Sequence, residues 1–152
     1  LKNSYLVLNK ESIMFSNNMN KFYSINKNNG ILNWEQKVNS NLRPTIINGV
    51  IFSVSLEGYL FLIDSNSGNI LRITDIFDIF KVKKRKKIKP IDFVMGLKNI
   101  YLTTDNGKLL IIDIKSGKAK RIIKIDGKKV SKPFISNNKI FVIKNNSIIR
   151  FN

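Results

Sequence analysis

The chain has 152 residues, of which 43% are apolar and 10% aromatic, and its 27 Lys and Arg against 10 Asp and Glu give a formal net charge of +17. This composition excludes a wholly disordered chain and is sufficient for one domain with a hydrophobic core. The absence of Cys and His excludes disulfides and thiolate nucleophiles, and it removes the commonest general base and metal ligand.

Short apolar segments separated by turn residues follow one another along the chain. Apolar and polar residues alternate from Ile51 to Ser55, Glu57-Gly58 makes a tight turn, and an apolar run then leads to Asp64. Asn106-Gly107 provides a similar turn later in the chain, and Asn-Gly is the strongest short signal for a β-hairpin. No segment has a sustained helical period with caps. In chain order, we expect strands near 5–9, 12–16, 21–26, 31–36, 43–48, 50–55, 59–64, 69–74, 91–96, 99–104, 108–113, 118–125, 133–137, 139–144 and 147–151.

An internal repeat organises these strands. Residues 13–30, 51–68 and 100–117 align without gaps, each beginning with Ile and ending on Gly, and a fourth copy begins at Ile140. Four residues before each glycine stands a side chain whose oxygen can bond backbone N–H groups, while the glycine itself permits a positive φ. These turn residues are Asn26 with Gly30, Asp64 with Gly68, and Asp113 with Gly117.

Repeated units of four antiparallel strands with this spacing fit the blades of a β-propeller. The sequence therefore predicts an all-β chain with about four blades, approximately 1–40, 41–75, 90–126 and 131–152, and an insert at 74–90. The last blade has only three expected strands, so we interpret the chain as a partial ring, the C-terminal half of a longer propeller. We then expect apolar columns of the first and last blades to have one side open to water: Phe15, Phe22 and Ile25, and Phe141, Ile143 and Ile148.

The insert has an apolar half that is followed by a basic run, Lys81 to Lys89. One interpretation is a docking element for a partner protein or for an anionic membrane surface, because clustered basic residues are attracted to anionic lipids. The other is a solvated loop whose apolar half packs on a blade. The candidate partner-binding residues in the run are Lys83, Lys84, Arg85, Lys86 and Lys87.

The high positive charge has two explanations. The chain has 22 Lys, 25 Ile and 21 Asn, and all three have A/T-rich codons, so one explanation is genome composition. The other is attraction to an anionic partner. Outside the run at 81–89 the lysines look scattered along the sequence, which argues against a nucleic-acid partner. Arg43 and Lys132, each directly before a proline that opens the apolar segment of an expected innermost strand, either face an anionic partner or are solvated charges on the rim.

The segment from Asn26 through Gly30 to Trp34 resembles the tryptophan-docking motif of the PQQ-like (quinoprotein) propeller repeats. In that family the turn glycine and the tryptophan lock adjacent blades together, so the resemblance implies a packing role for Trp34. Asp64 with Gly68, and Asp113 with Gly117, match the first half of the motif. At the tryptophan column they depart from it, because Arg72 and Arg121 stand there.

Two groups of proteins share this repeat, namely quinone-dependent dehydrogenases and the BamB-type lipoprotein scaffolds of outer-membrane β-barrel assembly. A dehydrogenase of this kind needs a catalytic Asp, oxygen ligands for Ca²⁺ and commonly a vicinal Cys pair. Here Asp64 and Asp113 belong to the repeat turn, Glu57 and Asp105 lie at hairpin turns, and Cys is absent. We therefore expect no catalytic, cofactor-binding or metal-binding residue in this chain.

The resemblance then implies a non-enzymatic protein-binding scaffold in the periplasm, associated with the outer membrane, whose partner is the β-barrel assembly machinery. The alternative is the C-terminal fragment of a PQQ-dependent dehydrogenase, which would bind PQQ and Ca²⁺.

Overall fold

The computed structural model describes residues 1–152, and its elements are fifteen strands and one four-residue helix. The expectation of an all-β chain is confirmed. No helix in it has the length and apolar character needed to cross a lipid bilayer. Contacts divide the chain into two compact units, Leu1–Thr74 and Asp75–Asn152, each of which contains two antiparallel sheets.

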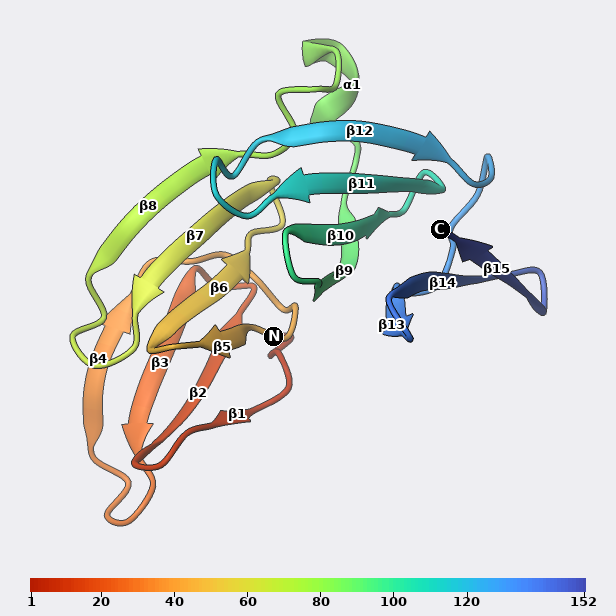
Figure 1. Ribbon diagram of the computed structural model, residues 1–152. Helices are drawn as coiled ribbons and strands as arrows, with labels where there is room; N and C mark the ends of the chain where they lie inside the picture. The colour runs from red at the N-terminus through yellow and green to blue at the C-terminus, as the bar shows by residue number, and fades with distance from the viewer. The chain divides into compact units, whose positions relative to one another are not determined.

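The first unit contains two sheets of four strands, which follow the chain order (Figure 1). The first sheet has the order β1-β2-β3-β4: β1 (Val7–Leu8), β2 (Ser12–Asn17), β3 (Lys21–Asn26) and β4 (Leu32–Gln36). The second sheet has the order β5-β6-β7-β8: β5 (Thr45–Ile47), β6 (Val50–Val54), β7 (Tyr59–Asp64) and β8 (Ile70–Asp75), which ends one residue into the second unit.

The second unit begins with the insert, which contains helix α1 (Val82–Arg85), and continues with two sheets. The first is formed by β9 (Pro90–Met95), β10 (Asn99–Thr104), β11 (Lys108–Asp113) and β12 (Ala119–Lys124), with β12 at one edge. The second has three strands, β13 (Phe134–Ser136), β14 (Lys139–Lys144) and β15 (Ser147–Phe151).

The repeat seen in the sequence has a counterpart in strand register. In the first sheet the pairing of β3 with β4 shifts between Ser24 and Ile25, so that one residue, Asn33, is skipped. The pairing of β11 with β12 shifts at the same column of the repeat, between Ile111 and Ile112. A β-bulge of this kind re-aims the side chain beside it, here the residue in the tryptophan column of each repeat.

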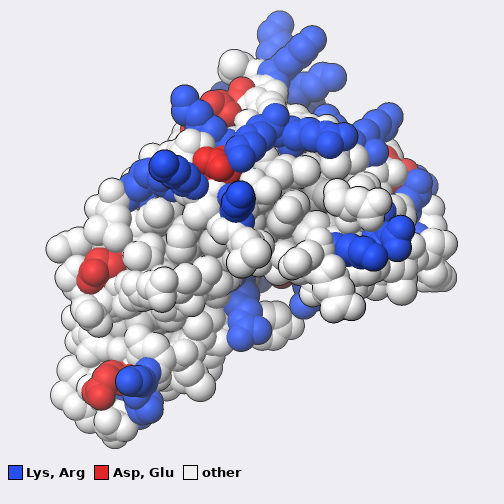
Figure 2. Space-filling view, in the orientation of Figure 1, with Lys and Arg blue, Asp and Glu red and all other residues white.

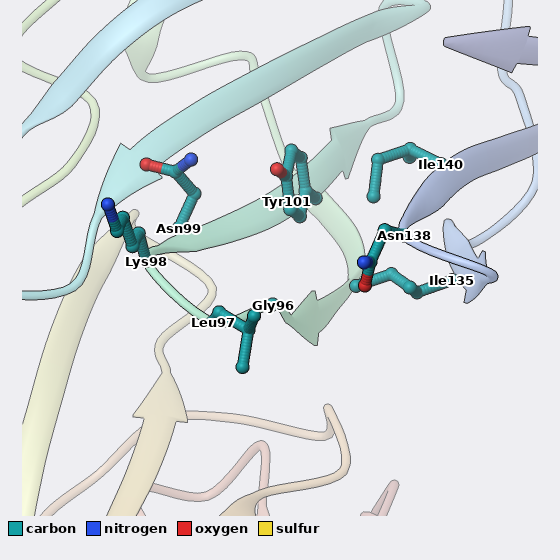
Figure 3. Close-up of a pocket in the computed structure, with 8 residues that line it drawn as sticks. All are labelled: Gly96, Leu97, Lys98, Asn99, Tyr101, Ile135, Asn138 and Ile140. Carbon is teal, nitrogen blue, oxygen red and sulfur yellow. The ribbon is translucent and has the colours of Figure 1, made fainter. Parts of the chain in front are cut away.

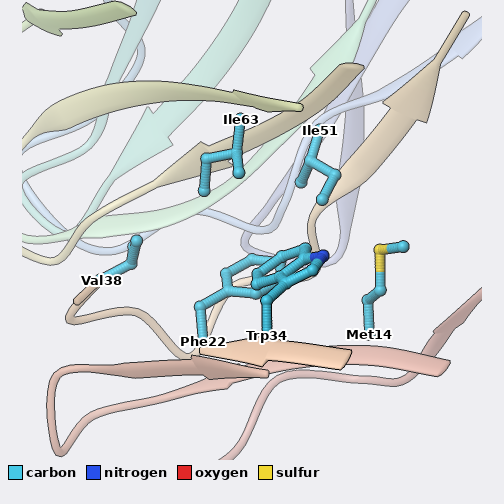
Figure 4. Packing of buried hydrophobic residues seen from close by; sticks show 6 residues of the cluster. All are labelled: Met14, Phe22, Trp34, Val38, Ile51 and Ile63. Carbon is cyan, nitrogen blue, oxygen red and sulfur yellow. The ribbon is translucent and has the colours of Figure 1, made fainter. Parts of the chain in front are cut away.

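A hydrophobic core lies between the two sheets of the first unit (Figure 4). Met14, Phe22 and Trp34 from the first sheet face Ile51 and Ile63 from the second. The expectation that Phe22 has one side open to water is therefore wrong, because its side chain is fully buried. Side chains alternate between the two faces of a strand, so Phe22 shares the packed face with Trp34. The neighbouring Phe15 and Ile25 are half-buried on the other face. In the last sheet Ile143 and Ile148 are exposed and Phe141 is half-buried.

Candidate functional site

The three repeat turns share one hydrogen-bond arrangement. Gly30, Gly68 and Gly117 have φ of 72°, 75° and 70°, and the N–H of each donates to the carbonyl four residues earlier at 2.8–2.9 Å. Asn26 Oδ1 accepts from the N–H groups of the residues two and three positions later, at 2.9 and 3.3 Å. Asp64 Oδ1 does the same at 3.1 and 2.7 Å, and Asp113 Oδ2 accepts one such bond at 2.8 Å. These polar side chains bond the backbone of their own turns.

Both turn carboxylates are stabilised as anions. Hydrogen bonds from the backbone and hydroxyl of Ser67 lower the pKa of Asp64. The ammonium of Lys120, 2.7 Å from Asp113 Oδ1, is the largest cause of a pKa well below the ordinary range for Asp113, and bonds from Ser116 add to it. A carboxyl group with so low a pKa is a weak proton acceptor near pH 7, which suits a turn more than a general base.

Trp34 docks on the glycine turn of the next sheet. Its indole lies against Gly68, and its Nε1–H donates to the backbone carbonyl of Ser65 at 3.1 Å. Gln36, two residues along β4, donates from Nε2 to the carbonyl of Gly68 at 2.8 Å, and Phe22 stacks on the indole with ring centroids 5.6 Å apart. The sequence could not predict the hydrogen bond from Gln36, because the bond joins two sheets and depends on how they pack against each other.

The remaining cations singled out in the sequence lie in different places. Arg72 is half-buried in β8, whereas Arg121 is exposed on β12. Arg43 and Lys132 are exposed beside buried prolines, one in each unit.

The insert packs its apolar half into the second unit and leaves its basic half exposed. Ile76, Phe77, Phe80 and Ile88 are buried, with exposed fractions of at most 7%. Of the candidate partner-binding residues, four lysines are exposed and Arg85 is half-buried. The exposed ones are Lys83, Lys84, Lys86 and Lys87.

Specific contacts hold the insert in place. Arg85 Nη2 lies 2.5 Å from Asp75 Oδ2, while Asp75 Oδ1 accepts the N–H of Phe77 at 3.0 Å. At the other end, Lys89 and Asp105 are joined by two bonds of 2.9 Å, one from the N–H of each residue. The insert is thus fixed at its start by Asp75, which also holds the middle of the basic run through Arg85, and at its end by Lys89.

The positive charge gathers on the second unit. Of the whole chain's charged residues, 20 of the 27 basic and six of the ten acidic ones fall in this unit, so it has a net charge of +14 out of +17. Figure 2 shows Lys and Arg side chains over α1 and along β12. Although these residues are spread along the sequence, the fold places the basic residues of β12 near the basic insert.

A cavity of about 250 Å³ lies between the two sheets of the second unit (Figure 3). Tyr101 comes from β10, while Ile135, Asn138 and Ile140 come from the last sheet, and Leu97 is at the rim. Ligand sites in proteins are usually larger, roughly 300–1,000 Å³. The cavity is a small apolar recess with an amide and a phenol at its edge.

The carboxylates do not fit the Ca²⁺ of a quinoprotein. That ion takes six to eight oxygen ligands, with several carboxylates drawn together. No three acidic side chains come close enough in this chain to share a metal ion, and Asp64 and Asp113 are occupied by their own turns.

No protein-family model matches the chain, and no curated protein matches it in sequence. Its structure resembles BamB from Moraxella catarrhalis, with a TM-score of 0.74 and 10% identity over 97% of this chain and 41% of that one. Saccharomyces cerevisiae Sqt1 aligns with a TM-score of 0.76 and 14% identity over 99% of this chain and 44% of that one. The Pan2 WD40 domain of Neurospora crassa aligns with a TM-score of 0.67 and 14% identity over 97% and 45%.

The chain thus spans less than half the length of each of these proteins. Identities this low show the fold alone. The conclusion from sequence, sheets and comparisons together is that this chain has the fold of part of a β-propeller, built from three sheets of four strands and one of three.

Proposed function

We propose that the chain is part of a non-enzymatic, protein-binding propeller scaffold of the BamB type, which assists the assembly of outer-membrane β-barrel proteins in the periplasm. The observation that carries this proposal is the docking of Trp34 on Gly68 between two sheets. The PQQ-like repeat family, to which BamB-type scaffolds belong, resembles this chain in the motif that makes this contact. The structural likeness to BamB over 97% of the chain supports the same assignment.

The engagement of the acidic side chains favours a scaffold over a dehydrogenase. Asp64 and Asp113 bond their own turns, Asp75 pairs with Arg85, and Asp105 bonds the backbone of Lys89. These carboxylates stabilise the turns and the insert of the propeller. The role of these four carboxylates is therefore structural, as expected for a binding scaffold.

Binding to the purified integral barrel subunit of the assembly machinery, held in detergent micelles, tests the proposal. We expect saturable binding of the chain that persists at about 0.5 M salt, where attraction between exposed charges is largely screened. An unrelated outer-membrane barrel of similar size in the same detergent is the matched control. Equal binding to both barrels, or to neither, contradicts the proposal.

A second measurement addresses the enzymatic alternative. The chain is incubated with PQQ, Ca²⁺, an alcohol or aldose substrate and a redox dye, and we expect no reduction of the dye above the rate without protein. Dye reduction that depends on both PQQ and the chain would favour a dehydrogenase fragment.

A further inference from the structure

The second unit has a basic surface, made of the exposed part of the insert and the edge strand β12. The insert contacts the start of β11, where the Lys108 ammonium lies 5.1 Å from the centre of the buried Phe80 ring. Lys108 is in turn the direct cross-strand partner of Lys124 on β12. We call this the insert–β12 surface; its exposed basic residues are Lys81, Lys83, Lys84, Lys86, Lys87 and Lys89 on the insert, and Lys118, Lys120, Arg121 and Lys124 on β12 or directly before it.

The charges of this surface are largely uncompensated. Like charges placed directly opposite each other on neighbouring strands, as Lys108 and Lys124 are, destabilise a sheet. Of the nearby carboxylates, Asp75 pairs with Arg85 and Asp113 with Lys120, while the exposed Asp78 of the insert has no cation within salt-bridge distance. An anionic partner would relieve this repulsion, and the contacts that fix the insert at both ends keep its lysines displayed.

The chemistry of the surface distinguishes between anionic partners. Single-stranded nucleic acids are bound by aromatic side chains on which bases stack, but the insert's own aromatics, Phe77 and Phe80, are buried. The apolar side chains that the insert does expose are aliphatic, with Val82 73% and Ile79 37% accessible. Lysines around an exposed aliphatic side chain are the combination that binds at the interface of an anionic bilayer. Figure 1 shows α1 projecting beyond β12, so this combination is at an outer edge of the unit.

The geometry points to the insert–β12 surface as a site that binds the surface of membranes containing anionic lipids, with the lysines at the headgroups and Val82 reaching the interface. This inference does not depend on the proposed scaffold function. A chain that binds vesicles but no assembly subunit would support the membrane-binding site and contradict the proposed scaffold function.

Vesicles provide the test, with the whole chain as the protein. Partitioning is measured by flotation at about 0.1 M salt, where the Debye length is ~10 Å, on vesicles of phosphatidylcholine alone and of equal parts phosphatidylcholine and phosphatidylglycerol. We expect binding to the anionic vesicles only. A quadruple variant, K83Q/K84Q/K86Q/K87Q, is expected to lower the partition coefficient at least tenfold, since each basic residue near an anionic surface contributes about fivefold.

The control has the same net charge. A variant of the first unit, K2Q/K10Q/K27Q/K37Q, removes four exposed lysines that have no carboxylate partner within salt-bridge distance. We expect its partition coefficient on the anionic vesicles to be within about threefold of that of the unmodified chain, because the charge of the insert–β12 surface is unaltered. Equal losses in both variants would show that only the total charge matters, and would overturn the assignment of the site.

Two further outcomes separate lipid from other polyanions. Val82→Ser should weaken vesicle binding about threefold, because the smaller polar side chain transfers less apolar surface from water into the bilayer interface. The same substitution should leave binding to duplex DNA unchanged. Duplex DNA or polyglutamate that binds more tightly than the vesicles, and displaces the chain from them, would overturn the proposal in favour of a nucleic-acid or acidic-protein site.

Discussion

Gly68 packs against the Trp34 indole so closely that a Cβ added to the glycine would lie 2.5 Å from Trp34 Cδ2. The indole N–H reaches past the glycine to the carbonyl of Ser65, at 3.1 Å. Glycine is therefore required at this position for two reasons, its φ of 75° and the close approach of the indole ring. This contact joins the two sheets of the first unit.

Gly68→Ala should destabilise the first unit more than Gly30→Ala. Both glycines have positive φ, but a Cβ at Gly30 meets nothing within 4 Å. Gly30→Ala should cost only the backbone strain, about 1–2 kcal/mol. Gly68→Ala should add about 1–3 kcal/mol from overpacking against the ring. Trp34 is the single tryptophan, so its fluorescence during urea unfolding reports on this unit. Equal losses of stability in the two variants would show that the indole moves away from the added methyl group without a measurable loss of stability.

Trp34→Ala should cost about 3–5 kcal/mol, because it removes a large buried side chain from the core between the sheets. Without the ring, Gly68→Ala should no longer destabilise the unit through steric overlap, so the effects of the two substitutions should be less than additive. Unfolding of the single and double variants, followed by circular dichroism, measures this coupling. Additive effects would show that Trp34 and Gly68 stabilise the unit independently.

Acid should weaken the chain through its turn carboxylates. The pKa values of Asp64 and Asp113 are lowered in the folded chain, so the unfolded chain binds protons more readily. Their contribution is complete above the unfolded pKa of about 3.9 and is lost as the pH falls from there through the lower folded values. Asn26 makes the same turn with an amide, so D64N/D113N should still fold, with a urea midpoint that depends less on pH below about 5. Asp78→Asn, at an exposed position, is the control and should keep the full dependence.

Gly107→Ala should destabilise the second unit. A Cβ at Gly107 would collide with the backbone carbonyls of Asp126 and Lys128, which cannot move aside as a flexible side chain does. Its φ of 73° adds strain, for a combined cost of at least about 2 kcal/mol. Gly127→Ala, where a Cβ meets nothing within 4 Å, is the control and should change stability by less than about 1 kcal/mol. Thermal unfolding followed by circular dichroism compares them, and an unchanged midpoint for Gly107→Ala would contradict the packing of this turn.

Asp75→Ala should release the insert. This carboxylate pairs with Arg85 in the middle of the basic segment and accepts the N–H of Phe77, so its loss removes the contacts that fix the insert before Lys89. Locally opened segments are cleaved faster by proteases. We expect trypsin to cut within 81–89 several times faster than in the unmodified chain, with Asp78→Ala as the exposed control. Identical cleavage in both variants would mean that the buried apolar residues alone hold the insert.

The local features of this protein follow from residue chemistry that acts within a few positions. Asn106-Gly107 dictates a hairpin, alternation dictates strands, and the Asp64 and Asp113 columns dictate turns, because each requires a particular backbone conformation within a single repeat. Strands β1, β5 and β13 are shorter than expected. In β1, Asn9 ends the strand by accepting the N–H groups of Glu11 and Ser12.

Tertiary structure decided which residues meet. The burial of Phe22, the bond from Gln36 to Gly68 and the pairing of Lys108 with Lys124 all depend on register and on the packing of sheets. The sequence by itself determined the blades and a charge of +17, because periodicity and composition are properties of the chain. The gathering of basic residues on the insert–β12 surface was decided only by the fold, because it brings together a loop and a strand that are separated by three other strands of the chain.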